Sequence, residues 1–421
     1  MRPDYAAALN NRGNTLKELK RFDEALASFD RALAVRPDYA DALNNRGNTS
    51  KELKRFDEAL ASYDGALAVR PEHAEALNNR GNSLNEQKRF DEALASYDRA
   101  LAVRPDYADA HWNESLVRLL TGDFARGWEK FEWRWKNESL NLSPRNFAQP
   151  LWLGENGIAG KTILLHSEQG LGDTIQFCRY APLVAARGAR VLLQVPESLQ
   201  DLMASLAGVA QVIGSTSKLP DFDLHSPLLS LPLAFGTRLD TIPSATPYLS
   251  ASSESVRSWN ISLGLKYRPR IGLVWSGNPA HKNDHNRSIK LETLLPLLDI
   301  DATFVSLQKD IHADDASVLK DRSDLLNFGD KLKDFSETAG LVSNLDLVIS
   351  VDTSVAHLAG ALAKPVWVLL PFLSDWRWLL DRDDSPWYPT ARLFRQHAAG
   401  DWSGVVGDVG VELKKRLCVV G

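Results

Sequence analysis

The chain has 421 residues, 44% of them hydrophobic, so it is long enough to bury two or three separate cores. Its 49 basic and 54 acidic residues leave a net charge of −5, which gives no electrostatic basis for binding nucleic acid or inserting into an anionic membrane. The two cysteines, Cys178 and Cys418, lack the spacing of metal ligands, so we expect reduced thiols. The start carries no secretion signal, and no apolar run reaches the ~18 residues of a membrane helix. We therefore expect a soluble, cytoplasmic protein.

The first third of the chain is an internal repeat. Residues 2–35 recur at 36–69 and again at 70–103, a spacing of 34 residues, and a degenerate fourth copy continues to Asn137. Small residues such as Gly13 let two helices of one unit approach closely, and an aromatic residue such as Phe29 fills the gap to the next unit. The period and these positions resemble the tetratricopeptide repeat, which implies two antiparallel helices per unit.

One column of asparagines runs through the repeats. The same position of the first helix is Asn in all four units, at Asn11, Asn45, Asn79 and Asn113. Side-chain amides both donate and accept hydrogen bonds, so such a ladder on the concave face could hold an extended peptide without reading its sequence. The array resembles the repeat region of O-GlcNAc transferases, in which such asparagines hold protein substrates. The alternative is that the amides recur because the units are recent duplicates.

Beyond the repeats we expect a linker and two α/β domains. Residues 138–160 lose periodicity and contain prolines and glycines, which is typical of a connector. Residues 161–265 begin with a strand at 163–166, a glycine turn, a helix at 174–187 and a strand at 191–195. Residues 266–421 restart with a strand at Arg270 and end in a helix over 404–417, a type of helix that often crosses back to the first domain. The predicted fold class is therefore α + α/β, with repeats at 1–137 followed by two Rossmann-like domains and a cleft between them.

The stretch from Val348 to Pro371 predicts a strand, a tight turn, a helix and a second strand. The turn carries Asp352, Thr353 and Ser354, with His357 one turn into the helix. The N-terminus of such a helix presents unpaired N–H groups at the carboxyl edge of the sheet, where phosphates bind. The alternative is that Asp352 only caps the helix and His357 only packs.

A carboxylate follows the first strand of the first domain. In HSEQGLGDTIQF, Asp173 stands between the strand and its helix, at the edge expected to face the cleft. A carboxylate there can take a proton from a hydroxyl nucleophile. The alternative is a helix cap that serves only the glycine turn.

The second domain contributes polar groups to the same cleft. Ser276 and Gly277 follow its first strand, and the cations Arg287 and Lys290 come shortly afterwards, which suits a diphosphate. Gln308 ends the next strand, where it could meet a ribose or a base or simply lie on the surface.

The motifs GLGDT, RSIK and SVDTSVAHLAGALAKP, in this order, resemble the heptosyltransferase-type (family 9) glycosyltransferases of the GT-B fold. That resemblance implies that Asp173 is the catalytic base, that Lys290 contacts the donor phosphate, and that Asp352, Thr353 and His357 bind the nucleotide sugar. Ser354 departs from it, because the family usually has glycine there and serine crowds the phosphate. The combination with repeats also resembles bacterial flagellin-modifying transferases.

An aromatic segment at 374–389 follows this unit. Asp375 and Arg377 could reach sugar hydroxyls of the acceptor, whereas most of the aromatic rings would pack between the two domains.

The sequence thus predicts a metal-independent, inverting glycosyltransferase that moves a sugar from a nucleotide diphosphate to a hydroxyl of a protein held by the repeats. We expect no cofactor besides this substrate, and no metal site. The rival hypothesis is a scaffold that binds partner proteins through its repeats and carries a non-catalytic α/β module.

Overall fold

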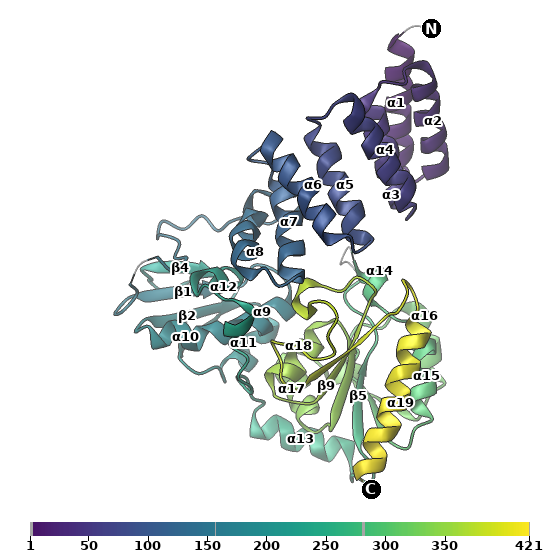
Figure 1. Cartoon of the computed structure of the whole chain (residues 1–421). Coiled ribbons are helices and arrows are strands. Elements are labelled where there is room, and N and C mark those ends of the chain that lie inside the picture. Colours follow the sequence, from purple (N-terminus) through teal and green to yellow (C-terminus); the bar gives the residue numbers. More distant parts are fainter. Residues whose placement is uncertain (1–2, 156, 280–282, 421) are drawn as a thin grey trace. The chain divides into compact units, whose positions relative to one another are not determined.

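The computed structural model describes residues 3–155, 157–279 and 283–420. The chain divides into two compact units, Met1–Pro144 and Arg145–Gly421, each of which is described by itself (Figure 1). The division lies inside the linker predicted at 138–160.

The first unit consists of four helix pairs (Figure 1). Their bounds are α1 (Pro3–Glu18), α2 (Phe22–Val35), α3 (Ala40–Glu52), α4 (Phe56–Val69), α5 (Ala74–Glu86), α6 (Phe90–Val103), α7 (Ala108–Leu120) and α8 (Phe124–Phe131). In the first pair, a Cβ added to Gly13 would lie 2.5 Å from Cε1 of Phe29. The equivalent pairs, at the same 2.5 Å, are Gly47 with Tyr63 and Gly81 with Tyr97. Glycine is therefore required where the two helices of a unit touch, because a methyl group would overlap the ring.

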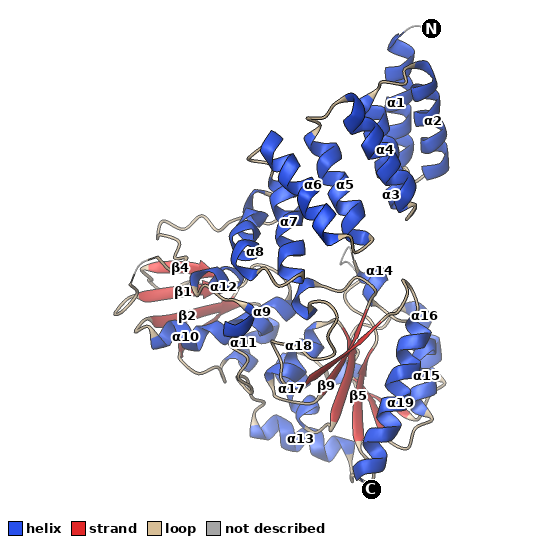
Figure 2. Cartoon of the chain, in the orientation of Figure 1, coloured by secondary structure: helices blue, strands red, loops and turns tan. Residues whose placement is uncertain are grey.

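The second unit contains two parallel sheets (Figure 2). The smaller sheet has the order β3-β2-β1-β4, with β1 (Thr162–His166), β2 (Arg190–Val195), β3 (Val209–Gly214) and β4 (Leu224–Pro227). Its helices are α9 (Leu171–Phe177), α10 (Ala181–Ala186), α11 (Glu197–Met203) and α12 (Leu231–Ala234). The helix predicted over 174–187 is interrupted by a 3₁₀ turn, η3 (Cys178–Tyr180), and Pro182 follows in the first turn of α10.

The larger sheet has six strands in the order β10-β9-β8-β5-β6-β7. Their bounds are β5 (Arg270–Val274), β6 (Thr303–Ser306), β7 (Leu325–Asn327), β8 (Leu347–Val351), β9 (Val366–Leu370) and β10 (Ala391–Arg395). We call the smaller sheet with its helices the first half of this unit, and the larger sheet with its helices the second half. The helices of the second half are α14 (Asp284–Arg287), α15 (Leu291–Leu298), α16 (Ala313–Lys320), α17 (Phe335–Ser343), α18 (Ser354–Ala361) and α19 (Trp402–Val420). β5 and β8 are adjacent, with Leu273 opposite Ile349, so their carboxyl ends open at one edge. The fold class predicted from the sequence is confirmed: a helical repeat array is followed by parallel-sheet α/β structure.

Two helices pack differently from their predicted places. The C-terminal helix α19 was expected to cross back to the first domain, but it buries Val405, Val409 and Leu413 in the core of the larger sheet. Helix α13 (Ser253–Leu263) lies before the boundary predicted at 265, yet it packs on α17. Trp259 of α13 donates its indole N–H to Glu337 of α17 at 2.8 Å. Packing therefore joins α13 to the second half.

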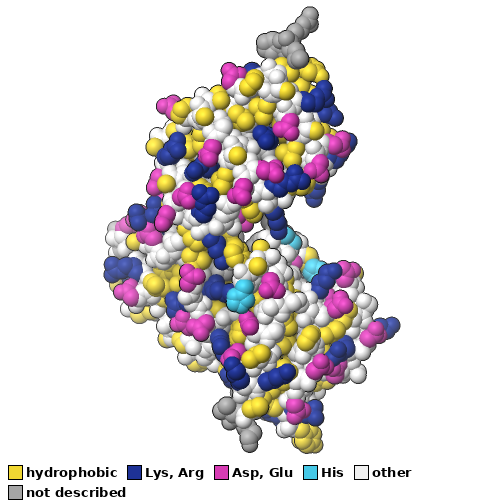
Figure 3. Space-filling view, turned by 45° about the vertical axis from the view of Figure 1, so that its right-hand side comes forward, with side chains coloured by type: hydrophobic (Ala, Val, Ile, Leu, Met, Phe, Trp, Pro, Cys, Tyr) yellow, Lys and Arg dark blue, Asp and Glu magenta, His cyan; other side chains and the backbone are white. Residues whose placement is uncertain are grey.

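Charged side chains are mixed on the surface. On the face drawn in Figure 3, Lys and Arg alternate with Asp and Glu, and neither sign forms one large field.

Candidate functional site

Two helix N-termini meet where the halves of the second unit come together. Helix α9 follows β1 of the smaller sheet, and helix α18 follows β8 of the larger one, and the two helices lie side by side (Figure 1). A Cβ on Gly172 would lie 2.9 Å from Cδ2 of His357 and 3.4 Å from Cα of Ser354. The lack of a side chain at Gly172 thus permits the two helices to approach closely. The turn that carries Asp173, the predicted base, therefore lies against the turn predicted to bind the phosphates.

The Asp173 carboxylate is oriented by two contacts. Its Oδ2 accepts the backbone N–H of Gly170 at 2.8 Å, which closes the first turn of α9. Its Oδ1 forms an ion pair with Nη2 of Arg377. The side chain is 19% exposed, so it is accessible but held. The capping role considered for Asp173 is present, and its role as a base stays a prediction.

Arg377 lies at the centre of this site. It belongs to the 3₁₀ turn η7 (Trp376–Trp378) and is buried. Its Nε donates to Oε1 of Gln176 at 2.7 Å, and its Nη1 donates to Oδ1 of Asp375 at 2.9 Å. The charges of Asp375 and Asp173 raise the pKa of Arg377 against the opposing effect of burial, so the guanidinium is a permanent cation. Its partners are protein groups, whereas the sequence predicted that Asp375 and Arg377 contact the acceptor sugar.

Asp352 is the most perturbed carboxylate of the site. Burial, together with the negative charge of Asp375, raises its pKa to about 6, although Arg287 and Arg377 oppose the rise. Its side chain is 16% exposed. A carboxylate with a raised pKa, at the end of a strand and among other charged groups, is typical of functional sites.

His357 is a neutral imidazole at physiological pH. Burial and the charge of Arg377 hold its pKa well below the ordinary value. Its Nδ1 lies 2.9 Å from the hydroxyl of Tyr388, and its ring stacks on Trp378 with centroids 5.5 Å apart. Its Nε2 is 3.9 Å from Oδ1 of Asp352, too far for a direct hydrogen bond.

The turn before α18 has a fixed geometry. Thr353 stands at the N-cap position of α18 without a side-chain capping bond, and its Oγ1 lies 3.0 Å from Oγ of Ser350. The backbone oxygen of the preceding residue, Asp352, accepts Nη1 of Arg287 at 3.1 Å. Ser354 is the first residue of the helix. Arg287, Asp352, Thr353 and Ser354, far apart in the sequence, are thus brought together.

Gly277, with Ser276 before it in the chain, lies beside Arg287. The sequence predicted that these three residues contact the donor. A Cβ on Gly277 would lie 2.5 Å from Nη2 of Arg287, so glycine lets the guanidinium lie on the backbone. The Oγ of Ser276 is buried and has no hydrogen-bond partner among the described residues. Lys290 is exposed at the N-terminus of α15. Residues 280–282 of this loop lie outside the described residues.

Gln308 has a structural role that the sequence did not reveal. Its Oε1 accepts the backbone N–H groups of Trp275 and Ser276, at 3.3 and 3.2 Å. Its Nε2 donates to the backbone oxygens of Ser276 and Asp310, at 3.1 and 2.9 Å. These four bonds use the full capacity of an amide. The predicted contact with a ribose or base would require breaking one of them, so we assign Gln308 to holding the β5 turn.

Sequence reasoning missed two residues that join the halves. Gln176 and Arg179 follow Asp173 at intervals of three, so one face of α9 and η3 carries all three side chains. Arg179 donates to the backbone oxygen of Trp387 at 2.7 Å and to the hydroxyl of Tyr248 at 2.9 Å. The spacing of three was visible in the sequence, but nothing there indicated what the face would contact.

Aromatic rings pack around this junction. Phe177 of the first half contacts Trp387, with centroids 5.7 Å apart, and Trp376 at 6.3 Å. This agrees with the interpretation that most rings of segment 374–389 pack between the domains.

The asparagine column makes contacts between repeats. Nδ2 of Asn45 donates to Oδ1 of Asn10 in the preceding unit at 3.0 Å. The equivalent bonds join Asn79 to Asn44 at 3.1 Å and Asn113 to Asn78 at 3.0 Å. Asn11, in the first unit, is exposed. One N–H of each later amide therefore links neighbouring units, and its use in binding a peptide stays a prediction.

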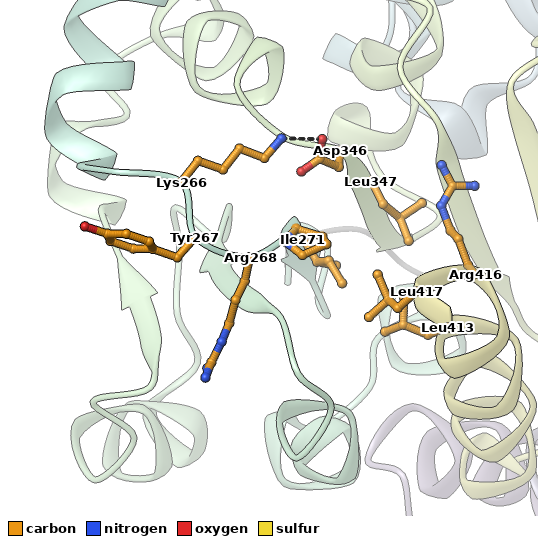
Figure 4. A pocket seen from close by; sticks show the side chains of 10 residues that line it. Lys266, Tyr267, Arg268, Ile271, Asp346, Leu347, Leu413, Arg416 and Leu417 are labelled. Carbon is orange, nitrogen blue, oxygen red and sulfur yellow. Dashed lines mark hydrogen bonds and ion pairs between the residues drawn. The ribbon is translucent and has the colours of Figure 1, made fainter. Parts of the chain in front are cut away.

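A separate cavity of about 400 Å³ lies at the opposite edge of the larger sheet (Figure 4). Ile271 and Leu347, from the amino ends of β5 and β8, form part of its wall, and Lys266 pairs with Asp346 at 2.7 Å on its rim. The residues predicted to bind the donor stand at the carboxyl ends of the same strands, so this cavity is not their site.

The described residues contain no group of three or more His, Cys, Asp or Glu side chains arranged to hold a metal ion. Within the same ranges, no helix combines the length and apolar character that crossing a membrane requires.

Comparison with known families identifies the first unit. Models of the tetratricopeptide repeat match residues 4–72, 51–108 and 86–131. These residues are tetratricopeptide repeats, including the degenerate fourth copy.

One relative extends beyond the repeats. The protein FlbA of Caulobacter vibrioides is 25% identical over 326 residues, which cover 71% of this chain and 54% of FlbA. The chain thus spans about half the length of this curated relative.

Solved structures resemble the repeat unit. The tetratricopeptide domain of Arabidopsis OM64 is 22% identical over 28% of this chain and 96% of its own, with a TM-score of 0.27. A repeat protein of Parabacteroides merdae is 25% identical over 32% of this chain and 52% of its own, with a TM-score of 0.29. The first such domain of RPAP3, described as bound to an HSP90 peptide, is 22% identical over 28% and 93%, with a TM-score of 0.27.

Proposed function

We propose that this protein is a glycosyltransferase of the GT-B type, which transfers a sugar from a nucleotide diphosphate to a hydroxyl of a protein acceptor. The observation that carries the proposal is the packing of Gly172 on Ser354 and His357. It sets the carboxylate of Asp173 beside the N-terminus of α18, and these are the two groups that such a transfer needs.

The proposed reaction uses these groups in sequence. The acceptor hydroxyl gives its proton to Asp173 while its oxygen attacks the anomeric carbon of the donor sugar. The bond from that carbon to the diphosphate breaks, and the diphosphate leaves with the electron pair. Arg287, Lys290 and the first turn of α18 would neutralise the charge that develops. Resemblance to the family 9 enzymes implies an inverted anomeric centre.

The repeats would supply the acceptor. Asn45, Asn79 and Asn113 each donate one amide hydrogen to a neighbouring unit, and these bonds leave their carbonyl oxygens without a partner among the described residues. A row of such oxygens, spaced one repeat apart, can accept backbone N–H groups of an extended peptide. This supports a protein acceptor over a lipid-linked one, for which a repeat array has no evident use.

A scaffold function remains the second candidate, and one observation favours it. Asp173 already has partners for both of its oxygens, Gly170 and Arg377, as a purely structural residue would. In that case the repeats would bind a partner protein, and the α/β unit would carry no activity.

Two measurements separate the candidates. Calorimetry with UDP, GDP and CMP tests donor binding: a glycosyltransferase binds at least one of them, and a scaffold binds none. Intact-mass spectrometry of proteins from cells with the wild type, with Asp173→Asn and without the chain tests transfer. We expect a mass increase on an acceptor only with the wild type, and Asp173→Asn should keep its nucleotide affinity. If Asp173→Asn produced the same mass increase as the wild type, Asp173 would not be the base.

A further inference from the structure

The contacts of Arg377 link the two halves at the proposed catalytic carboxylate. Arg377 follows β9 of the larger sheet, and its ion-pair partner Asp173 lies 204 residues earlier on α9. Gln176, one turn further along α9, is fully buried and accepts the Nε hydrogen at 2.7 Å. One guanidinium thus holds two residues of a single face of α9.

Most of the hydrogen-bonding capacity of the Arg377 guanidinium is used within the protein. Each of its three nitrogen atoms donates to a protein oxygen, on Gln176, Asp375 or Asp173. Arg377 is 8% exposed. An arginine that recognises a ligand presents its planar fork to the ligand, whereas here three of the five N–H groups already donate to the protein and the side chain is buried.

The charge balance points in the same direction. Asp173, Asp352 and Asp375 are the carboxylates whose charges act on Arg377, and Arg287 is the other cation whose charge acts on Asp352. Without the guanidinium, the three negative charges would repel one another, and the carboxylate of Asp173 would keep only the backbone N–H of Gly170 as a partner.

We propose that Arg377 is a positioning residue, which holds Asp173 in the orientation for proton transfer instead of contacting the acceptor sugar. This inference rests on the proposed function. Arg377 is not itself given a proton or a bond to substrate in this proposal; it acts through Oδ1 of Asp173. The proton-accepting step is therefore sensitive to a residue from the opposite half.

A double-mutant cycle of Asp173→Asn and Arg377→Gln tests this proposal on transfer rates. We expect Arg377→Gln to lower kcat on the order of a hundredfold, because a misplaced reacting group costs about that much, with the KM for the nucleotide sugar unchanged. In the Asp173→Asn background, where only a small residual rate is expected with purified protein, the same substitution should lower that rate no further. Arg377→Lys, which keeps the charge, should recover part of kcat. Arg382→Gln is the matched control, because Arg382 pairs with Asp384 in the same segment, outside the site, and we expect wild-type kinetics.

Two results would overturn the proposal. Losses that simply add in the double variant would mean that Arg377 acts independently of Asp173. A raised KM for the acceptor at unchanged kcat would make Arg377 a contact for the acceptor instead.

The urea unfolding midpoints of the wild type, the two single variants and the double variant give a second readout, which does not depend on sugar transfer. If the ion pair is formed, the double variant should unfold at the midpoint of its less stable single variant, and additive shifts would show that the contact does not exist. Coupled midpoints without any transfer by the wild type would leave the contact intact and refute the proposed function, and the positioning role with it.

Discussion

Replacing Asp352 with Asn should stabilise the protein at neutral pH. Burial raises the pKa of Asp352 from 3.8 to about 6, so the folded protein holds this proton more tightly than the unfolded chain does. Well below pH 3.8 the carboxyl is protonated in both states and costs nothing. Between pH 3.8 and 6 the unfolded chain releases this proton more readily than the folded state, so stability is lost as the pH rises through that window, and the loss is complete above pH 6. A shift of about 2 pKa units at 1.36 kcal/mol each corresponds to about 3 kcal/mol.

The size of the effect should therefore depend on pH. We expect the free energy of unfolding of Asp352→Asn to exceed that of the wild type by about 3 kcal/mol at pH 7.5, and by about 1 kcal/mol at pH 4.5. Urea unfolding at both pH values measures the difference, and Asp221→Asn, on an exposed loop of the other half, is the control. Equal stabilisation at both pH values, or none, would refute the reasoning that burial destabilises the ionised carboxylate.

Two further substitutions test the contacts that build the two units. Gly172→Ala places a methyl group 2.9 Å from Cδ2 of His357, so the free energy of unfolding measured in urea should fall by about 1–3 kcal/mol. Gly157→Ala is the control, because open space surrounds Gly157, and it should change the free energy of unfolding by less than about 0.5 kcal/mol. Asn79→Ala leaves the buried Oδ1 of Asn44 without its donor, so thermal unfolding should show a loss of about 1–3 kcal/mol; an unchanged Tm would mean that water replaces the amide.

Local patterns determined much of the fold. The 34-residue period predicted the helix pairs, and the apolar runs around Asp352 predicted β8, α18 and β9, because each of these elements is defined by neighbours in the sequence. The partner of a buried face was not predictable in this way. The apolar spacing in α19 shows that one side is covered, but not that β10 and α15 cover it.

The candidate site was predictable only in part, for the same reason. Asp173 follows a strand of the smaller sheet, Asp352 and Thr353 follow a strand of the larger one, and parallel strands place such residues at the carboxyl edge of their own sheet. Arg377 and Gln308 depend on tertiary contacts: one pairs with a residue 204 positions away, and the other closes a turn whose shape the sequence does not state. Only the fold brings such partners together.

The amide bonds of the helical array have a consequence for how it can change over evolution. Each bond joins an asparagine of one unit to an asparagine of the unit before it. The three bonds are Asn45 to Asn10, Asn79 to Asn44 and Asn113 to Asn78, so the same pair recurs at each of these joints. A gene duplication or deletion among the first three units would therefore recreate the same amide bond at the new joint, whereas the fourth unit carries Trp112 at the acceptor position. The array can grow or shrink by these units without losing the bond that joins neighbours.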